Sequence, residues 1–338
     1  MADHPLRSDM EVMWHGGERA RSINQLLQEN GYPPLPASTI NGYGARHWRT
    51  QPPGYRTPAP AAKTAPTHLV IPDTQVKPGV PTDHLRWIGQ YILDRKPDVI
   101  VHLGDHWDMP SLSSYDRGKK AMEGRRYVED VRAGNEAFAL LDIPTATHNA
   151  RLKPGEAPYS PRKVLLRGNH EDRITRAAQD NAQLEGAVTL DDLNSPGWEV
   201  YDFLVPVEID GVTYAHYFYN HNTGRALGGM VATRLKTLGF SFTQGHQQGL
   251  DIAMRPVGRR MQYGLVAGSC YLAEEDYRGP QAQAHWRGVV MKHEVSEGSY
   301  DPMLVSLSYL CLRYEGVPLN VFLRESYGNQ FGFLDQWC

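Results

Sequence analysis

The chain has 338 residues, a formal net charge of −3 and 41% hydrophobic residues, which together describe an ordinary globular protein. That length can bury one large core and leave room for a small additional domain. The near-neutral charge excludes an overall electrostatic footprint for nucleic acid, but it does not exclude a local one. No apolar run approaches membrane-spanning length, so we expect no membrane partner.

Cysteine usage and the N-terminal composition indicate a reducing compartment. The three cysteines, Cys270, Cys311 and Cys338, show no metal-type spacing and are too few for a disulfide framework. Residues 1–17 are polar and lack the apolar core of a signal peptide. We therefore expect a cytoplasmic protein, whose oligomeric state the sequence does not predict.

Two short helices are expected in an N-terminal module of residues 1–50. Apolar residues recur at helical spacing over 17–30, and Gly31 with the prolines after it ends that helix. A second helix over 38–48 carries or adjoins Arg46, His47 and Arg49. A helix, a tight turn and a second, basic helix resemble a helix-turn-helix DNA-binding unit. The alternative is a helical arm that packs on the main domain or forms an oligomer contact.

A linker of residues 51–67, rich in proline and alanine, is expected to tether this module to a main domain of residues 68–338. The expected strands of the main domain are 68–73, 98–103, 162–167, 203–209, 212–218, 240–244, 264–267, 286–292 and 303–313. Its expected helices are 82–95, 126–141, one from His170 to about 185, and 225–238, with a polar insertion at 143–161. Asp210-Gly211 predicts a hairpin turn. This order indicates an α/β fold with two facing mixed sheets flanked by helices.

Side chains of the kinds that bind metals follow several of these expected strands. They are Asp73, Gln75, Asp105, Asn169, His170, His216, His246 and Gln248. Glycines precede many of them, as in Gly104-Asp105, Gly168-Asn169 and Gly245-His246. Because ligands bind in the crevice at the carboxyl ends of strands in open α/β sheets, we expect these side chains to converge.

In order and spacing, these motifs resemble those of the calcineurin-like metallophosphoesterases. That family carries Asp-x-His, Gly-Asp-x-x-Asp, Gly-Asn-His-Asp/Glu, a lone His and Gly-His-x-His, and the resemblance covers roughly residues 68–300. It implies a four-layer α/β/β/α sandwich. The stretches 104–115 and 268–288 are also similar to the bacteriophage-type, DNA-repair-exonuclease-like branch, which for a phage-encoded protein implies the host cytoplasm.

The resemblance implies two metal positions. The first is assigned to Asp105, Asn169, His216 and His246, all of which are present. The second would use Asp73, the shared Asp105, and Gln75 and Gln248, where the family has histidines. An amide oxygen is a weaker ligand than imidazole for borderline ions. We therefore expect one tight site and one weak or empty site, for Mn²⁺ or alternatively Mg²⁺, Fe²⁺, Zn²⁺, Ni²⁺ or Co²⁺. The alternative is a single-metal site around which the glutamines only form hydrogen bonds.

The same resemblance implies that His170 stabilises or protonates the leaving group as a general acid, the alternative being a hydrogen bond to a ligand. Asp105 and Asn169 complete the catalytic set as ligands. Asp108 and Glu171 are expected to orient the imidazoles.

Four other residues have two interpretations, and a fifth has one. Arg167 either pairs with phosphate or forms an ordinary ion pair, and Trp107 either stacks on a base or anchors the core. His221 and Asn222 either line the cleft or are exposed loop residues. His148, in the polar insertion, is expected to face solvent.

The expected reaction is hydrolysis of a phosphate ester, because a bound divalent ion activates water and offsets charge on a phosphoryl oxygen. The helix-turn-helix-like module and its tether favour DNA as the substrate of a phosphodiesterase, a nuclease or nickase. One alternative is a phosphomonoesterase acting on phosphoproteins or nucleotides. Another is a DNA-binding protein with a weakened phosphoesterase site, against which the intact Asp105, Asn169, His170, His216 and His246 argue.

Overall fold

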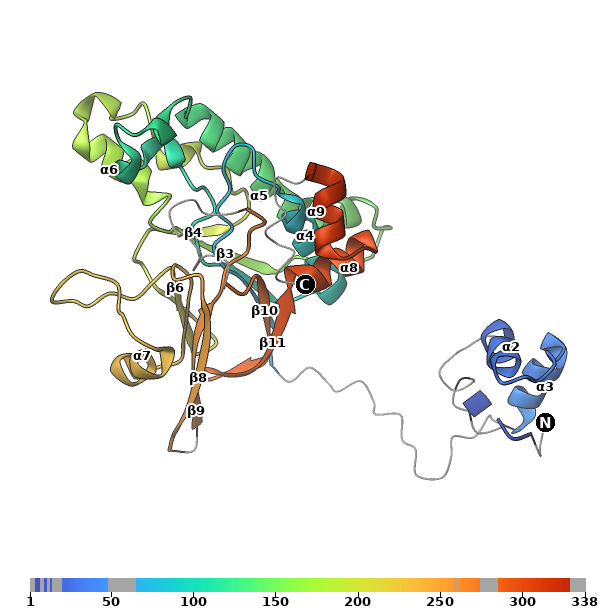
Figure 1. The fold of residues 1–338 in the computed structure, drawn as a ribbon. Coiled ribbons are helices and arrows are strands. Elements are labelled where there is room, and N and C mark those ends of the chain that lie inside the picture. The colour runs from blue at the N-terminus through green and yellow to red at the C-terminus, as the bar shows by residue number, and fades with distance from the viewer. Residues whose placement is uncertain are drawn as a thin grey trace. The chain divides into compact units, whose positions relative to one another are not determined.

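The structure, a computed structural model, describes residues 4–6, 9–10, 13, 20–47, 65–258, 260–273 and 285–328. The chain divides into two compact units, Met1–Ala62 and Lys63–Cys338 (Figure 1). Most of the predicted linker, together with Arg49 and Cys338, lies outside the described residues.

The N-terminal unit contains the two predicted helices, α2 (Ala20–Glu29) and α3 (Ala37–His47). Its small core is formed by Met10, Ile23, Leu27 and Ile40, all of which are buried. The turn between the helices is held by Asn24, whose side chain donates to the Leu35 carbonyl and accepts from the Leu35 N–H, both at 2.8 Å. The side chains of Arg46 and His47 lie outside the described set.

In the larger unit, the first sheet has the order β11-β10-β1-β2-β3-β4. Its strands are β1 (His68–Ile71), β2 (Val99–His102), β3 (Arg162–Leu166), β4 (Glu199–Tyr201), β10 (Gly288–Ser296) and β11 (Ser299–Ser306). Strands β1 to β4 are parallel, whereas β10 and β11 are antiparallel to their neighbours.

The second sheet has the order β5-β6-β7-β9-β8. Its strands are β5 (Val207–Ile209), β6 (Val212–Ala215), β7 (Phe242–Gln244), β8 (Leu250–Val257) and β9 (Arg260–Ala267). The predicted hairpin joins β5 to β6, and both turn residues, Asp210 and Gly211, have positive φ. Strand β8 was not expected from the sequence; its side chains are mostly half-buried or exposed, so its hydrophobic pattern is weak.

Six helices and five short 3₁₀ turns are described in this unit. The helices are α4 (Asp83–Arg95), α5 (Tyr127–Ala150), α6 (Asp172–Asp180), α7 (Val231–Leu238), α8 (Leu307–Glu315) and α9 (Leu319–Tyr327). The 3₁₀ turns are η1 (Pro110–Leu112), η2 (Ser114–Asp116), η3 (Lys120–Met122), η4 (Ala182–Leu184) and η5 (Leu190–Asp192). Helices α6 and α7 are therefore shorter than predicted. No helix in the described parts of the chain is long and apolar enough to cross a membrane.

Helix α5 corrects the prediction of a polar insertion at 143–161, because it continues through Pro144 and carries His148. Gly89 of α4 lets the two helices approach so closely that a Cβ there would lie 2.6 Å from the Leu140 carbonyl oxygen and 3.1 Å from Pro144 Cδ. Tertiary packing keeps this segment helical across a residue that by itself favours a break.

The predicted strand 303–313 is also wrong in its second half, which forms α8. The side chain of Ser306 accepts a hydrogen bond from the Tyr309 N–H at 3.1 Å and so caps the new helix. Leu307, Leu310 and Cys311 are buried at helical spacing. A short apolar run does not by itself distinguish a strand from a helix.

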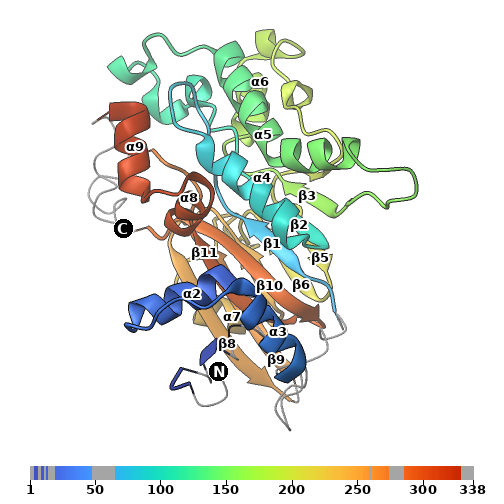
Figure 2. The ribbon, with the colours of Figure 1, turned by 90° about the vertical axis from the view of Figure 1, so that its right-hand side faces the viewer.

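Three clusters of buried hydrophobic residues pack the sheets and helices together. One layer lies between the sheets and joins residues such as Val101 and Val164 to Tyr214 and Leu265. The opposite face of the first sheet packs against α4, α5, α8 and α9, as Figure 2 shows. Helix α7 covers the second sheet (Figure 1). The fold is therefore α/β with two mixed sheets, as predicted.

Candidate metal centre

The parallel pairing of strands brings the predicted motifs to common edges of the two sheets. Ile71 pairs with His102, and His102 with Leu165, so the chain leaves β1, β2 and β3 at one level. Ala215 pairs with Gln244 in the second sheet, so β6 and β7 also end together. Hydrogen bonds join these two edges, because the His246 N–H donates to Asp73 Oδ1 at 3.0 Å.

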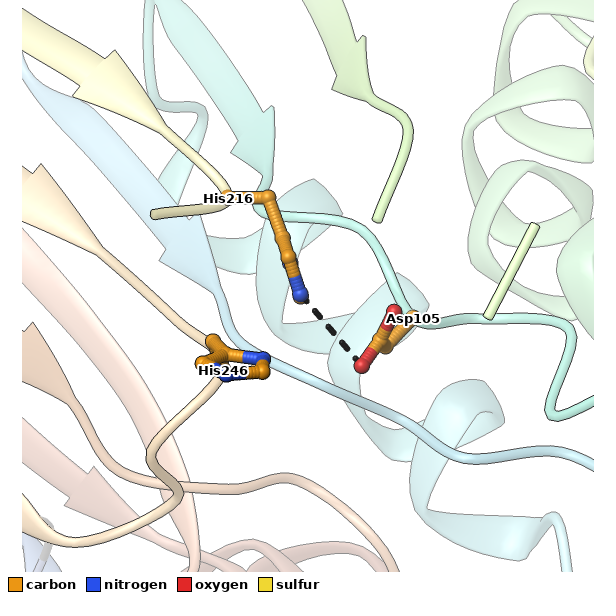
Figure 3. A group of neighbouring side chains, drawn as sticks. All are labelled: Asp105, His216 and His246. Carbon is orange, nitrogen blue, oxygen red and sulfur yellow. Dashed lines mark ion pairs between the residues drawn. The ribbon is translucent and has the colours of Figure 1, made fainter. Parts of the chain in front are cut away.

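Asp105, His216 and His246 form a cluster in which one ligand atom of each lies within 4.8 Å of the others. Figure 3 shows the three side chains pointing toward one another from separate loops. His216 Nε2 lies 3.4 Å from Asp105 Oδ2 and 2.9 Å from Asn169 Oδ1. Two ligand atoms about 2.1 Å from one ion are about 3 Å apart when they are adjacent. His216, Asp105 and Asn169 therefore lie at ligand-like spacing, and His246 lies within 4.8 Å of Asp105 and His216.

The ring orientation of His216 suits a ligand, and its protonation is controlled by the neighbouring carboxylates. Its Nδ1 faces the Leu103 carbonyl at 2.7 Å, which leaves Nε2 directed toward Asp105. Burial opposes the charge of the imidazole, but Asp105 and Asp73 raise the pKa of His216 to about 9. Burial also opposes the charge of Asp105, but His170 and His216 hold the pKa of that carboxyl well below its usual range.

The backbone around the centre is held in an uncommon conformation. Gln75, Asp105, His246 and Gln248 have φ between 47° and 66°, the left-handed region. They are four of the ten non-glycine residues with positive φ in the described parts of the chain. Such residues cost about 1 kcal/mol each and gather where a site requires a particular side-chain direction.

Two glycines allow backbone to pass directly beside the carboxylates. A Cβ on Gly168 would lie 2.1 Å from Asp105 Oδ1, and a Cβ on Gly245 would lie 2.3 Å from Asp73 Oδ1. Any other residue at either position would displace the carboxylate. The glycines of the Gly-Asn-His and Gly-His motifs are therefore required by close packing against the candidate ligands.

Glu171 has a different role from the predicted one. Its buried carboxylate accepts hydrogen bonds from four backbone N–H groups, those of Asp105, His106, Trp107 and Gly168, at 2.6–3.0 Å. The described contacts of Glu171 orient no imidazole. Instead, these hydrogen bonds connect the loop after β2 to the loop after β3 and so fix the backbone that positions Asp105 and Asn169.

Asp108 matches its prediction, because its Oδ1 lies 2.6 Å from His170 Nδ1. Burial lowers the pKa of His170, but Asp105 and Asp108 more than offset this and raise it. Arg173 NH2 lies 3.2 Å from His170 Nε2, and Lys77 Nζ lies 3.2 Å from Asp108 Oδ2. The predicted general acid is therefore held by a carboxylate on one nitrogen and bordered by cations.

At the second predicted metal position, some buried polar side-chain atoms have no described hydrogen-bond partner, whereas the Gln248 oxygen has one. Asp73 Oδ2 and both polar atoms of the Gln75 side chain are buried with no hydrogen-bond partner among the described residues. Burial raises the pKa of Asp73 to about 6. Gln248 differs, because its Oε1 accepts a hydrogen bond from the Tyr271 hydroxyl at 2.7 Å. The Gln248 oxygen is therefore already engaged in a hydrogen bond.

Other candidates lie outside the metal cluster. Arg167 forms an ion pair with Asp202 at 2.7 Å. Trp107 is 1% exposed, stacks on Phe138 and donates to the Asn135 side chain, so it anchors the core and is not accessible to a base. His221 and Asn222 are exposed loop residues that lie outside the cluster but line a cavity on the α7 side of the second sheet, and His148 is half-buried on α5.

Four residues at the centre were not singled out from the sequence. They are Tyr271, Arg173 and Tyr217, whose ring lies 4.6 Å from that of His246; Lys77, beside Asp108, is the fourth. Arg173 follows His170 by one turn, a spacing that could have indicated it. Tyr217 and Tyr271 carry no such local signal.

Comparisons with known proteins assign no family. No protein-family model and no curated protein matches the sequence. Among solved structures, one crystal structure aligns with 72% of this chain and 99% of its own length at 13% identity, with a TM-score of 0.34. The candidate metal centre therefore stands on the geometry of its own residues.

Proposed function

We propose that the protein is a divalent-metal-dependent phosphodiesterase that hydrolyses DNA, with the four-layer sandwich of the calcineurin-like metallophosphoesterases. The observation that carries this proposal is the convergence of Asp105, Asn169, His216 and His246 from four loops of two sheets. A carboxylate, an amide oxygen and two imidazoles are the donors that Mn²⁺, Fe²⁺ and Zn²⁺ accept.

The residues around the cluster suit chemistry on a phosphate. A divalent ion at this position, when bound, would activate water and offset charge on the phosphoryl oxygens. His170 would donate a proton or hydrogen bond to the leaving oxygen, held in place by Asp108. Arg173 and Lys77 place two cations beside this pair, where they would attract a negatively charged diester.

The glutamines favour one tight metal position and one weak one. Asp73 has a free buried oxygen that would suit a cation. Gln248, by contrast, offers an amide oxygen already engaged with Tyr271, and Gln75 offers a neutral amide. A second ion at these donors would be bound less tightly than one held by imidazoles.

DNA as substrate is supported by the N-terminal unit. Two helices joined by the turn that Asn24 holds give this small unit a defined form, and the sequence places Arg46, His47 and Arg49 at the end of the second helix. A second helix whose sequence ends in basic residues is suited to phosphate or groove contacts. On a tether, it would raise the local concentration of DNA at the metal centre.

The activity is tested by incubating the protein with Mn²⁺ and supercoiled plasmid, bis(4-nitrophenyl) phosphate or 4-nitrophenyl phosphate. We expect nicking of the plasmid and cleavage of the diester, both abolished by EDTA and by Asp105→Asn. Cleavage of the monoester alone would replace this proposal with a phosphomonoesterase. Plasmid left intact under every metal tested, with no diester cleavage, would refute phosphodiesterase activity.

The DNA-binding role is tested with a chain that begins at Lys63. We expect it to bind duplex DNA more weakly than the full chain and with a smaller dependence on salt, because fewer phosphates are contacted. Its cleavage of the small diester should be unchanged. Equal DNA affinity of the two chains would remove the helix-turn-helix interpretation.

A further inference from the structure

A cavity of about 500 Å³ opens beside the metal centre, on the face of the second sheet that α7 covers. Its floor is formed by Thr213 and Ala215 of β6, and its walls by the loop after β6 and the residues around the end of α7. A space of this volume accommodates a small organic group.

One side chain connects the cavity to the metal centre. Tyr217 lines the cavity, and its ring centroid lies 4.6 Å from that of His246 and 5.7 Å from that of His216. Tyr217 follows His216 directly in sequence, so the strand end that positions a candidate ligand also positions the cavity wall. A group held in the cavity would be separated from a phosphate at the metal only by the ring of Tyr217.

The lining is aromatic and carries no fixed charge. Tyr217, Phe218, Tyr219 and Phe240 contribute rings, Asn220 and Asn222 contribute amides, and His221 contributes an imidazole. None of the described residues that line the cavity is Asp, Glu, Lys or Arg. Such a surface does not favour a phosphate, which the cations near His170 would hold instead. It suits a flat, neutral ring with hydrogen-bonding groups at its edge.

The cavity walls are defined by specific backbone structure. Leu204, at one wall, has φ 66°, a conformation that a non-glycine residue adopts only when its surroundings impose it. Another part of the wall is a paired loop, because the Leu227 N–H donates to the Phe218 carbonyl at 2.7 Å and the Asn220 N–H to the Arg225 carbonyl at 2.8 Å. This wall is therefore held in shape before any ligand arrives.

From this juxtaposition we infer that the cavity is a base-binding subsite, which holds the nucleobase next to the phosphodiester that is cleaved. The inference rests on the proposed phosphodiesterase activity for its placement in the reaction, but the cavity itself is defined without it. Stacking on Tyr and Phe is tolerant of base identity. The subsite would therefore select nucleotides over other phosphodiesters and would not select a sequence.

The test compares two substrates with the same leaving group, thymidine 5′-(4-nitrophenyl phosphate) and methyl 4-nitrophenyl phosphate, in the presence of Mn²⁺. We expect the nucleoside ester to have a KM lower by about tenfold, the effect of one stacked base. Thr213→Trp, which fills the cavity, and Tyr219→Ala, which removes a ring, should abolish that difference. Both variants should keep the rate on the methyl ester. Met230→Ala, a change at a 70% exposed position outside the lining, is the matched control.

A binding measurement separates this inference from the proposed activity. Thymidine is titrated into the full chain without metal, and saturable binding weakened about tenfold by Thr213→Trp is expected. Thymidine binding without cleavage of either ester would refute the activity and leave the subsite. Cleavage of both esters with equal KM, or thymidine binding unchanged by Thr213→Trp, would refute the subsite and leave the activity.

Discussion

The two halves of the candidate metal centre share a backbone frame but differ in their donors. In the first half, one ligand atom of Asp105 and one of each of two imidazoles lie within 4.8 Å of one another. In the second, Gln75 and Gln248 stand where the resembling family has histidines, and Gln248 is engaged with Tyr271. The backbone nevertheless takes the same left-handed conformation at both glutamines as at Asp105 and His246.

This difference indicates that the frame and the ligand set are separable. The frame depends on left-handed turns, on glycines packed against carboxylates and on the four backbone hydrogen bonds to Glu171. The identity of a donor depends on one side chain alone. A donor can therefore be weakened without moving the loops, and the predictions below test how far the halves differ.

The largest effect is expected from His246→Ala, which removes an imidazole from the first half. Loss of a metal ligand should lower both Mn²⁺ affinity and diester hydrolysis by at least about 100-fold, since even the loss of an indirect contact costs 10- to 100-fold. Metal titration and initial rates measure this. Gln247→Ala, the adjacent change, should have little effect. Full activity in His246→Ala would mean that the centre is assigned wrongly.

The next effect concerns the second half. Gln75→His combined with Gln248→His should raise bound Mn²⁺ from one ion per chain toward two, because imidazoles bind borderline ions more tightly than amides. Elemental analysis after dialysis gives the stoichiometry. Gln247→His serves as the control for an added histidine. An unchanged stoichiometry in the double variant would contradict the explanation given for the glutamines.

A smaller effect is expected from Tyr271→Phe, which leaves Gln248 Oε1 buried without its hydrogen-bond partner. The free energy of unfolding without metal should fall by about 1 kcal/mol. Excess Mn²⁺ should recover part of this loss, because the released oxygen is then available to a cation. Urea denaturation with and without Mn²⁺ measures both quantities, with Tyr309→Phe, at a 41% exposed position, as control. A loss that Mn²⁺ leaves unchanged would separate Tyr271 from the metal position.

The smallest effect contrasts two buried imidazoles. Whereas carboxylates raise the pKa of His216, burial lowers that of His68 to about 4, although its hydrogen bond to Asp210 opposes this. As the pH falls below 6.5, His68 therefore becomes protonated in the unfolded chain before it does in the folded protein. The free energy of unfolding consequently decreases between pH 6.5 and about pH 4. From pH 7 to 6 the loss should be somewhat under about 1 kcal/mol, and His68→Gln should remove it. Identical pH slopes of stability in both proteins would exclude this account.

The sequence by itself determined the order of the main elements and the positions of the candidate ligands. Strands β1, β2 and β3 lie within two residues of their predicted ends, because short β-branched runs followed by glycine and polar residues are local patterns. The same reasoning failed where local pattern and packing disagree. Helix α5 crosses Pro144 because it packs on α4, and α8 begins inside an apolar run because Ser306 caps it.

Only the tertiary structure decided the partner and the role of each polar residue. Glu171 binds backbone N–H groups up to 66 positions away, and Tyr271 reaches Gln248 across 23. Trp107 is a core residue because α5 covers it, with Gly134 of that helix packed against its ring. Buried polar groups must find partners wherever the fold supplies them, and a linear pattern records the group but not its partner.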